Sequence, residues 1–268
     1  MNKSAAFTLS LLWLAAACQT TTTTAPPRLE TTPRHDEWVD VRSDTRVVRT
    51  YVVYPQRSDR GPAIVLIHEN RGLTDWVRTV ADRIAEQGYI AIAPDLLSGT
   101  APNGGGTKDF PTEDAAREAI GKLQRENVLG DLRAVVAYAK SIPSANGRVS
   151  VAGFCWGGGR TWDAANGISG LSASYVFYGT GPQDAAGVAN IDAPVYGFYG
   201  GDDARVNATI PKSQELMTAV SKTFEPVTYE GAGHAFMRAG EAADATEANR
   251  KAQRDAWERW LKLLKGAP

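Results

Sequence analysis

The fold is decided by residues 153–158, Gly153-Phe154-Cys155-Trp156-Gly157-Gly158, which place a cysteine on a turn framed by glycines. Residues 148–152 before the turn carry alternating apolar side chains, as a short strand does, and the small residues after it suit the start of a helix. This order, with the spacing G-x-nucleophile-x-G, is typical of a nucleophile elbow in which Cys155 takes the usual place of serine. The turn requires small neighbours because its backbone is strained and the helix passes close to the sheet.

Cys155 is therefore a candidate nucleophile. A thiol at a helix N-terminus has its anion favoured by the helix dipole and by free backbone N–H groups. The alternative interpretation is a buried structural cysteine in a glycine-rich turn. An acid and a histidine follow Cys155 in the order that such a site requires, which favours the catalytic interpretation.

The acid and the histidine each follow a predicted strand. Residues 194–199 lead into Asp202 and Asp203, and residues 224–229 lead into His234. Open α/β sheets hold their sites at the carboxyl ends of their strands, so these side chains are expected to meet near Cys155. Only one of the adjacent aspartates can point at the histidine. Asp203 is the preferred partner, and Asp202 is interpreted as a helix-capping or turn residue.

Strands alternate with helices along the chain. The predicted strands are residues 46–54, 63–67, 89–93, 148–152, 172–178, 194–199 and 224–229. The predicted helices are residues 74–87, 126–140, 209–221 and 245–264. This alternation predicts an α/β fold with a mostly parallel, twisted sheet and helices on both faces.

Four motifs occur in a fixed order between Arg46 and the C-terminus. They are Ile64-Val65-Leu66-Ile67-His68-Glu69-Asn70-Arg71-Gly72-Leu73, Ala93-Pro94-Asp95-Leu96, Gly153-Phe154-Cys155-Trp156-Gly157-Gly158, and Gly200-x-x-Asp203-x-x-Val206 paired with Gly233-His234-Ala235-Phe236. Together they resemble the dienelactone hydrolases, the cysteine-nucleophile branch of the α/β-hydrolases. The resemblance implies the α/β-hydrolase fold and the hydrolysis of esters or lactones, and its pattern implies that the acid is Asp203.

The resemblance also gives roles to residues that follow the predicted strand at 63–67. From the sequence alone, Glu69 is interpreted as a surface ion-pair residue. The resemblance implies instead a carboxylate beside the thiol that helps it to ionise when substrate arrives. His68 is expected to point to the other side and to be structural. The family's oxyanion hole implies the backbone N–H groups of Asn70 and Trp156.

Substrate binding is where the chain departs from the family pattern, in which two arginines clamp a carboxylate. Arg238 matches one of them, and Gly99 occupies the place of the other. Losing one arginine weakens the expectation of an acidic lactone, because a planar bidentate arginine is the usual group that grips a carboxylate. Arg71 and Arg160 are candidates to replace it. A surface arginine is the alternative interpretation of Arg238.

Residues 1–18 predict export. The apolar run of residues 5–17 is too short to span a membrane and fits a secretory signal. Residues 14–18, Leu-Ala-Ala-Ala-Cys, resemble the lipobox of bacterial lipoproteins. In that interpretation Cys18 is the lipidated first residue of a periplasm-facing lipoprotein. Ordinary cleavage after Ala17, which would give a soluble periplasmic protein, is the alternative.

The region after the leader divides into a tether and a domain. Residues 19–35 are rich in threonine and proline, have no apolar periodicity and predict an extended tether. Residues 36–268 predict a single α/β-hydrolase domain. Membrane contact is expected only through the lipid at Cys18.

Composition narrows the function further. The formal net charge of −1 gives no long-range attraction to nucleic acid. Of the two cysteines, one lies in the leader, so no disulfide is expected in the mature chain. No metal-ligand spacing is present, and the glycine run at 103–106 lacks the G-K-[ST] ending of a phosphate loop. The sequence therefore predicts a monomer without cofactor or metal.

The predicted function is hydrolysis of small carboxylic esters or lactones through an acyl-cysteine intermediate. Cys155 attacks the carbonyl, His234 acts as base and then as acid, and Asp203 orients it. The alternatives are a thioesterase or amidase on the same scaffold, a non-catalytic envelope binding protein and a thiol-based redox sensor. The complete set of Cys155, Asp203, His234 and Glu69 argues against a binding protein. The lack of a second thiol in the mature chain argues against a redox sensor.

Overall fold

The computed structural model describes residue 1, residues 27–44 and residues 46–267. Within them an eight-stranded sheet has the order β1-β2-β4-β3-β5-β6-β7-β8. The strands are β1 (Asp36–Arg42), β2 (Val47–Val53), β3 (Gly61–Ile67), β4 (Ile90–Pro94), β5 (Ala145–Phe154), β6 (Ser174–Phe177), β7 (Val195–Gly200) and β8 (Phe224–Tyr229). β2 is antiparallel to both of its neighbours, β1 and β4. The other six strands, β3 to β8, run parallel to one another. The predicted fold class is confirmed.

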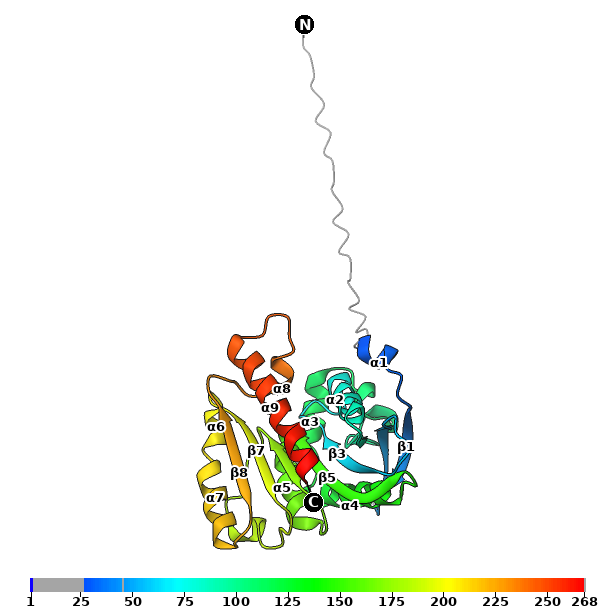
Figure 1. The fold of residues 1–268 in the computed structure, drawn as a ribbon. Coiled ribbons are helices and arrows are strands. Elements are labelled where there is room, and N and C mark those ends of the chain that lie inside the picture. Colours follow the sequence, from blue (N-terminus) through cyan, green and yellow to red (C-terminus); the bar gives the residue numbers. More distant parts are fainter. Residues whose placement is uncertain (2–26, 45, 268) are drawn as a thin grey trace.

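Helices cover both faces of this sheet (Figure 1). They are α1 (Pro27–Thr31), α2 (Asp75–Glu86), α3 (Glu113–Lys122), α4 (Arg125–Ser141), α5 (Trp156–Gly167), α6 (Ala204–Asn207), α7 (Ile210–Ala219), α8 (Phe236–Ala239) and α9 (Glu247–Gly266). α2 and α9 pack on one face, and α4, α5 and α7 pack on the other. Because both faces are buried, the central strands are apolar throughout.

Strand β5 shows how one segment serves both faces. Its residues alternate in direction, as the pleat requires. Ala152 and Phe154 join the core beneath α2 and α9, whereas Val149 and Val151 join the core beneath α4. β5 lies between β3 and β6 in the middle of the sheet, so its carboxyl end carries Cys155 to the centre of the sheet edge.

The short helices α1, α6 and α8 were not predicted from the sequence, and neither were two longer elements, β1 and α3. β1 is an edge strand that pairs only with β2, and its charged residues break the apolar pattern of a buried strand. α3 buries only Ala116 and Ile120, too few apolar residues to give a helical stripe. Both elements lie at the margins of the fold, where burial imposes little pattern on the sequence.

The segment before β1 differs from the predicted tether of residues 19–35. Within it, residues 27–31 form helix α1, and Arg34 pairs with Asp82 of α2, with 2.7 Å between Nε and Oδ1. Asp82 is fully buried, and it also accepts a hydrogen bond from Thr32. The segment is thus held on the domain before residue 36. The predicted leader and Cys18 lie outside the described residues. In the part of the chain that is described, no helix has the length and apolar character needed to cross a membrane.

Candidate active site

Cys155 lies between β5 and α5 on a strained turn, with φ +55° and ψ −114°. Glycine is required on both sides of it. A Cβ atom at Gly153 would lie 2.1 Å from the carbonyl oxygen of Gly157. A Cβ atom at Gly157 would lie 2.4 Å from the carbonyl oxygens of Ile67 and His68. The first turn of α5 therefore packs against the end of β3, and only glycine permits that approach.

A chain of hydrogen bonds joins Cys155 to the predicted histidine and acid. Nε2 of His234 lies 3.0 Å from the Cys155 sulfur, and Nδ1 lies 2.5 Å from Oδ2 of Asp203. Asp203 is buried and caps the start of α6, where its other carboxylate oxygen accepts the N–H of Val206 at 3.4 Å, so Asp203 has the capping role that was one of the two predicted for Asp202. Asp202 is exposed. Of the two adjacent aspartates, Asp203 is the one that contacts the histidine.

The charge on His234 follows from these contacts. Its hydrogen bond to Cys155, together with that to Asp203, raises the pKa of His234 from 6.5 to about 9, although burial opposes the rise. The ring therefore carries a proton at neutral pH. The protonated ring thus lies within hydrogen-bond reach of the Cys155 sulfur, 3.0 Å away.

Glu69 is not on the surface, where the sequence alone would place it. Only 3% of the residue is exposed. Its Oε2 accepts a hydrogen bond of 2.8 Å from Nε of Arg238 in α8, whereas its Oε1 has no hydrogen-bond partner among the described residues. Arg238 is half-buried, with 35% of its side chain exposed. The two residues thus form an ion pair that solvent reaches only from the arginine side.

The two predicted oxyanion donors lie on the elements that flank Cys155. Trp156 is the first residue of α5, and Asn70 follows Glu69 just after β3. Neither backbone N–H donates a hydrogen bond to any other described residue. The close packing of α5 on the end of β3 brings these segments together, and free N–H groups at a helix N-terminus attract negative charge.

His68 has a structural role in this arrangement. It is fully buried, and burial lowers its pKa. Nδ1 donates to the backbone carbonyl of Glu69 at 2.7 Å, and Nε2 accepts the N–H of Leu96 at 3.2 Å. Its ring stacks on Trp156, with 5.5 Å between ring centres. His68 therefore joins the ends of β3 and β4 to the start of α5.

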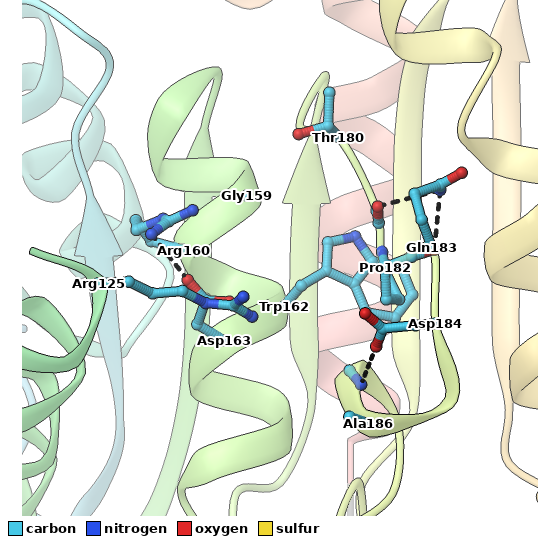
Figure 2. A pocket seen from close by; sticks show the side chains of 12 residues that line it. Arg125, Gly159, Arg160, Trp162, Asp163, Thr180, Pro182, Gln183, Asp184 and Ala186 are labelled. Carbon is cyan, nitrogen blue, oxygen red and sulfur yellow. Dashed lines mark hydrogen bonds and ion pairs between the residues drawn. The ribbon is translucent and has the colours of Figure 1, made fainter. Parts of the chain in front are cut away.

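Neither candidate replacement for the second clamping arginine is free. Arg71 pairs with Glu113 at 2.9 Å. Arg160 pairs with Asp163 at 3.0 Å and lines a cavity of about 420 Å³ beside α5. Figure 2 shows Arg160 and Arg125 both directed at Asp163.

The position expected for the second arginine is occupied by a glycine, which has no side chain. Gly99 has φ +74°, and a Cβ atom there would meet nothing within 4 Å. Arg238 is therefore the one arginine of the predicted clamp that the described residues contain.

Tyr178, which lies directly after β6, was not predicted to be part of the site. Its ring meets that of His234 edge-on, with 5.2 Å between ring centres. Tyr178 is 1% exposed and has φ +40°, an unusual value for a residue other than glycine. No sequence pattern indicates this contact, because a tyrosine at the end of a strand is common in a hydrophobic core.

Comparison with known proteins identifies a family and several relatives that this chain resembles. The family model described as the dienelactone hydrolase family matches residues 48–267. A protein of Methylorubrum extorquens that is named a carboxymethylenebutenolidase is 34% identical to this chain over 203 residues. The match covers 71% of this chain and 68% of the relative. One named in Escherichia coli K12 is 31% identical, over 80% of this chain and 81% of the relative. A structure described as a dienelactone hydrolase of Klebsiella pneumoniae has a TM-score of 0.74 and 26% identity, covering 85% of this chain and 97% of its own.

Proposed function

Because the chain belongs to the dienelactone hydrolase family, we propose that it hydrolyses small carboxylic esters or lactones through a covalent acyl-cysteine intermediate. The observation that carries this proposal is the continuous contact from Cys155 through His234 to Asp203 at the centre of the sheet edge. A nucleophile, a base and a group that orients the base within hydrogen-bond reach are the parts that acyl transfer requires.

The first half of the proposed reaction acylates the enzyme. The Cys155 thiolate attacks the carbonyl carbon, and the new oxyanion accepts hydrogen bonds from the N–H groups of Asn70 and Trp156. As the intermediate collapses, the bond from carbon to the leaving oxygen breaks. The protonated His234 gives its proton to that oxygen, which departs as an alcohol or, in a lactone, stays tethered to the acyl group.

The second half releases the acyl group. His234, now neutral, accepts a proton from water, and the resulting hydroxide attacks the thioester carbonyl. The carbon–sulfur bond then breaks, which frees a carboxylic acid and restores the thiolate beside the imidazolium. Asp203 holds Nδ1–H throughout and so keeps Nε2 directed at the sulfur.

The ion pair of Glu69 and Arg238 supports a role for substrate charge. A carboxylate on the substrate would compete with Glu69 for Arg238, the member of the pair that solvent reaches. Glu69 would then be left beside the thiol without its partner, as a base for any Cys155 that is protonated. With glycine at position 99, the proposed substrates carry one carboxylate at most, held by a single arginine.

A thioesterase on the same scaffold and a non-catalytic binding protein are the competing functions. The purified protein is assayed on short-chain aryl esters, short-chain thioesters and a panel of lactones, each with and without iodoacetamide. Cys155→Ala is assayed beside the wild type. Turnover of esters or lactones that vanishes on alkylation and in the variant is the expected result. Turnover of thioesters alone would replace the proposal, and a folded protein inactive on every substrate would contradict it.

We also propose that the protein is exported and lipidated at Cys18. The apolar run ending in Leu14-Ala15-Ala16-Ala17-Cys18 supports this, as does the threonine-rich stretch after it. Labelled palmitate supplied to a bacterial host is expected to appear in the wild-type protein and not in Cys18→Ser. An unlabelled protein recovered in soluble form from the periplasm would support ordinary cleavage after Ala17.

A further inference from the structure

Two buried polar atoms beside the catalytic residues lack hydrogen bonds. Oε1 of Glu69 and the hydroxyl of Tyr178 have no partner among the described residues. Both residues are almost fully buried, at 3% and 1% exposure, so water does not reach them readily. Buried polar atoms in native proteins are nearly always paired, and each exception needs an explanation. Here one atom is an acceptor and the other is a donor.

Tyr178 is fixed in place by its surroundings. Its N–H donates to the carbonyl of Phe198 at 2.8 Å, and the preceding carbonyl, that of Phe177, accepts the N–H of Cys155 at 3.0 Å. Its ring packs edge-on against His234 and also against Phe236. The backbone at φ +40° is strained, and strain of this kind gathers at functional sites. The Tyr178 side chain is therefore held in one orientation, with its ring against the catalytic histidine.

Glu69, in contrast, has one contact that a ligand can break. Among the described residues, the Glu69 carboxylate accepts one hydrogen bond, from Arg238. If a substrate carboxylate takes the guanidinium, a buried carboxylate is left with no donor, which is strongly unfavourable. Burial and the nearby charges of Glu69 and Cys155 raise the pKa of Tyr178, so its hydroxyl stays protonated and is available as a donor.

We propose that Tyr178 is a positioning residue whose hydroxyl donates a hydrogen bond to Glu69 once a substrate carboxylate has taken Arg238. Glu69 turns by rotation of its own side chain, while Tyr178 remains in place. The new hydrogen bond keeps the freed carboxylate beside Cys155 instead of letting it follow the arginine. This inference rests on the proposed hydrolase function, and it concerns only substrates that carry a carboxylate.

The test uses two substrates that differ in one group. They are 5-oxotetrahydrofuran-2-carboxylate, a lactone with a carboxylate, and its neutral carboxamide. Tyr178→Phe removes only the hydroxyl. On the carboxylate its kcat is expected to fall by about tenfold or more, the effect of one hydrogen bond to a charged group, with KM changed by less than about twofold. On the carboxamide, kcat is expected to equal that of the wild type.

Tyr175→Phe is the matched control. Tyr175 lies in β6 just before Tyr178, is fully buried, and also has a hydroxyl without a hydrogen-bond partner among the described residues. Its ring stacks on Tyr196, and no ring contact joins it to His234 among the described residues. Its loss is expected to leave both substrates unaffected. Thermal unfolding of both variants shows whether they fold. Should Tyr178→Phe fail to fold, 4-fluorophenylalanine at position 178 keeps the ring against His234, lacks the O–H donor and carries the same expectation.

A second measurement asks whether Tyr178 acts through Glu69. In a Glu69→Ala background, Tyr178→Phe is expected to have no further effect on the carboxylate substrate. Additive losses would overturn the inference, as would an equal loss of kcat on both lactones. Wild-type turnover that is absent in Cys155→Ala establishes the proposed function separately, so in that case either of these results rejects only the role of Tyr178. A wild type inactive on both lactones would remove the premise and reject the inference with it.

Discussion

At the scale of single residues, the charge on His234 links the geometry of the site to its chemistry. The sulfur of Cys155 and the carboxylate of Asp203 lie at opposite nitrogens of the ring, and together they hold a proton on it up to a pH of about 9. The ring thus begins the proposed reaction in the acid form that the leaving group needs.

The pH dependence of hydrolysis tests this charge. The rate is expected to fall as pH rises through about 9, because His234 then loses its proton. Asp203→Asn removes one of the groups that raise the pKa of His234, so the alkaline decline is expected at lower pH, with kcat reduced on the order of 10²-fold or more. Asp202→Asn, the exposed neighbour, is expected to change neither. An alkaline limb that stays in place in Asp203→Asn would contradict the assignment.

The same proton makes the fold sensitive to alkali. The pKa of His234 is raised on folding, so the contacts of its charged ring stabilise the fold fully below about pH 6.5 and lose that contribution as pH rises through about 9. Urea unfolding from pH 6 to pH 10 is expected to show this decline in the wild type and a smaller one in His234→Gln. Equal declines in the two proteins would assign the loss of stability to other groups.

Substitution of Arg238 tests the proposal that the substrate carries a carboxylate. Arg238→Gln is expected to lower kcat/KM on a carboxylate-bearing lactone by about tenfold or more, the contribution of one charge-assisted contact, and to leave the matching carboxamide nearly unchanged. Arg71→Gln is the control, because Arg71 is partly exposed and already pairs with Glu113. The same loss on both lactones in Arg238→Gln would argue for a purely structural ion pair with Glu69.

At the scale of elements, the buried parts of the fold were predicted well and the margins were not. Strands buried on both faces have continuous apolar sequences, and amphipathic helices repeat with a period of 3.6 residues, so both patterns can be read directly. Asp203 and His234 were found because they follow such strands. The pairing of Glu69 with Arg238 joins residues far apart in the chain, and the strained backbone of Tyr178 has no local signal.

Alanine substitutions at two glycines of α5 test the packing of this helix on β3. Gly157→Ala would bring a methyl group to 2.4 Å from two carbonyl oxygens. It is expected to destabilise the protein by about 1–3 kcal/mol or more and to abolish activity, because the elbow must shift. At Gly159 a Cβ atom would meet only ordinary contacts at 3.7 Å, so Gly159→Ala is expected to be neutral or stabilising by up to about 1 kcal/mol. Similar urea-unfolding midpoints for both variants would contradict the packing argument.

At the scale of the whole molecule, the strand order brings the catalytic residues together. An ion pair holds the N-terminal segment on the domain. Cys155, Asp203 and His234 come from three different strand ends, and only the assembled sheet brings them together. The segment before β1 is held against α2, where Arg34 meets the fully buried Asp82. The predicted boundary at residue 36 is thus less sharp than the composition of the chain indicates.

Breaking that ion pair is expected to loosen the segment and the domain together. Asp82→Ala leaves Arg34 without this carboxylate and is expected to reduce the free energy of unfolding by about 3 kcal/mol. Trypsin is expected to cut after Arg34 faster than in the wild type. Asp59→Ala, which breaks a well-exposed pair with Arg57, is expected to change stability by less than about 1 kcal/mol. An equally small effect of Asp82→Ala on urea unfolding would show that the segment is held by other contacts.

The glycine at position 99 also constrains how this enzyme can change over evolutionary time. The space around it is open, so a long side chain would not clash there. Yet its backbone lies at φ +74°, a conformation that any L-amino acid occupies at a disadvantage of about 1 kcal/mol or more. An arginine introduced here by a single codon change would therefore carry this backbone cost unless the loop also changed its shape. Exchange of arginine for glycine at this position is thus easier to make than to reverse.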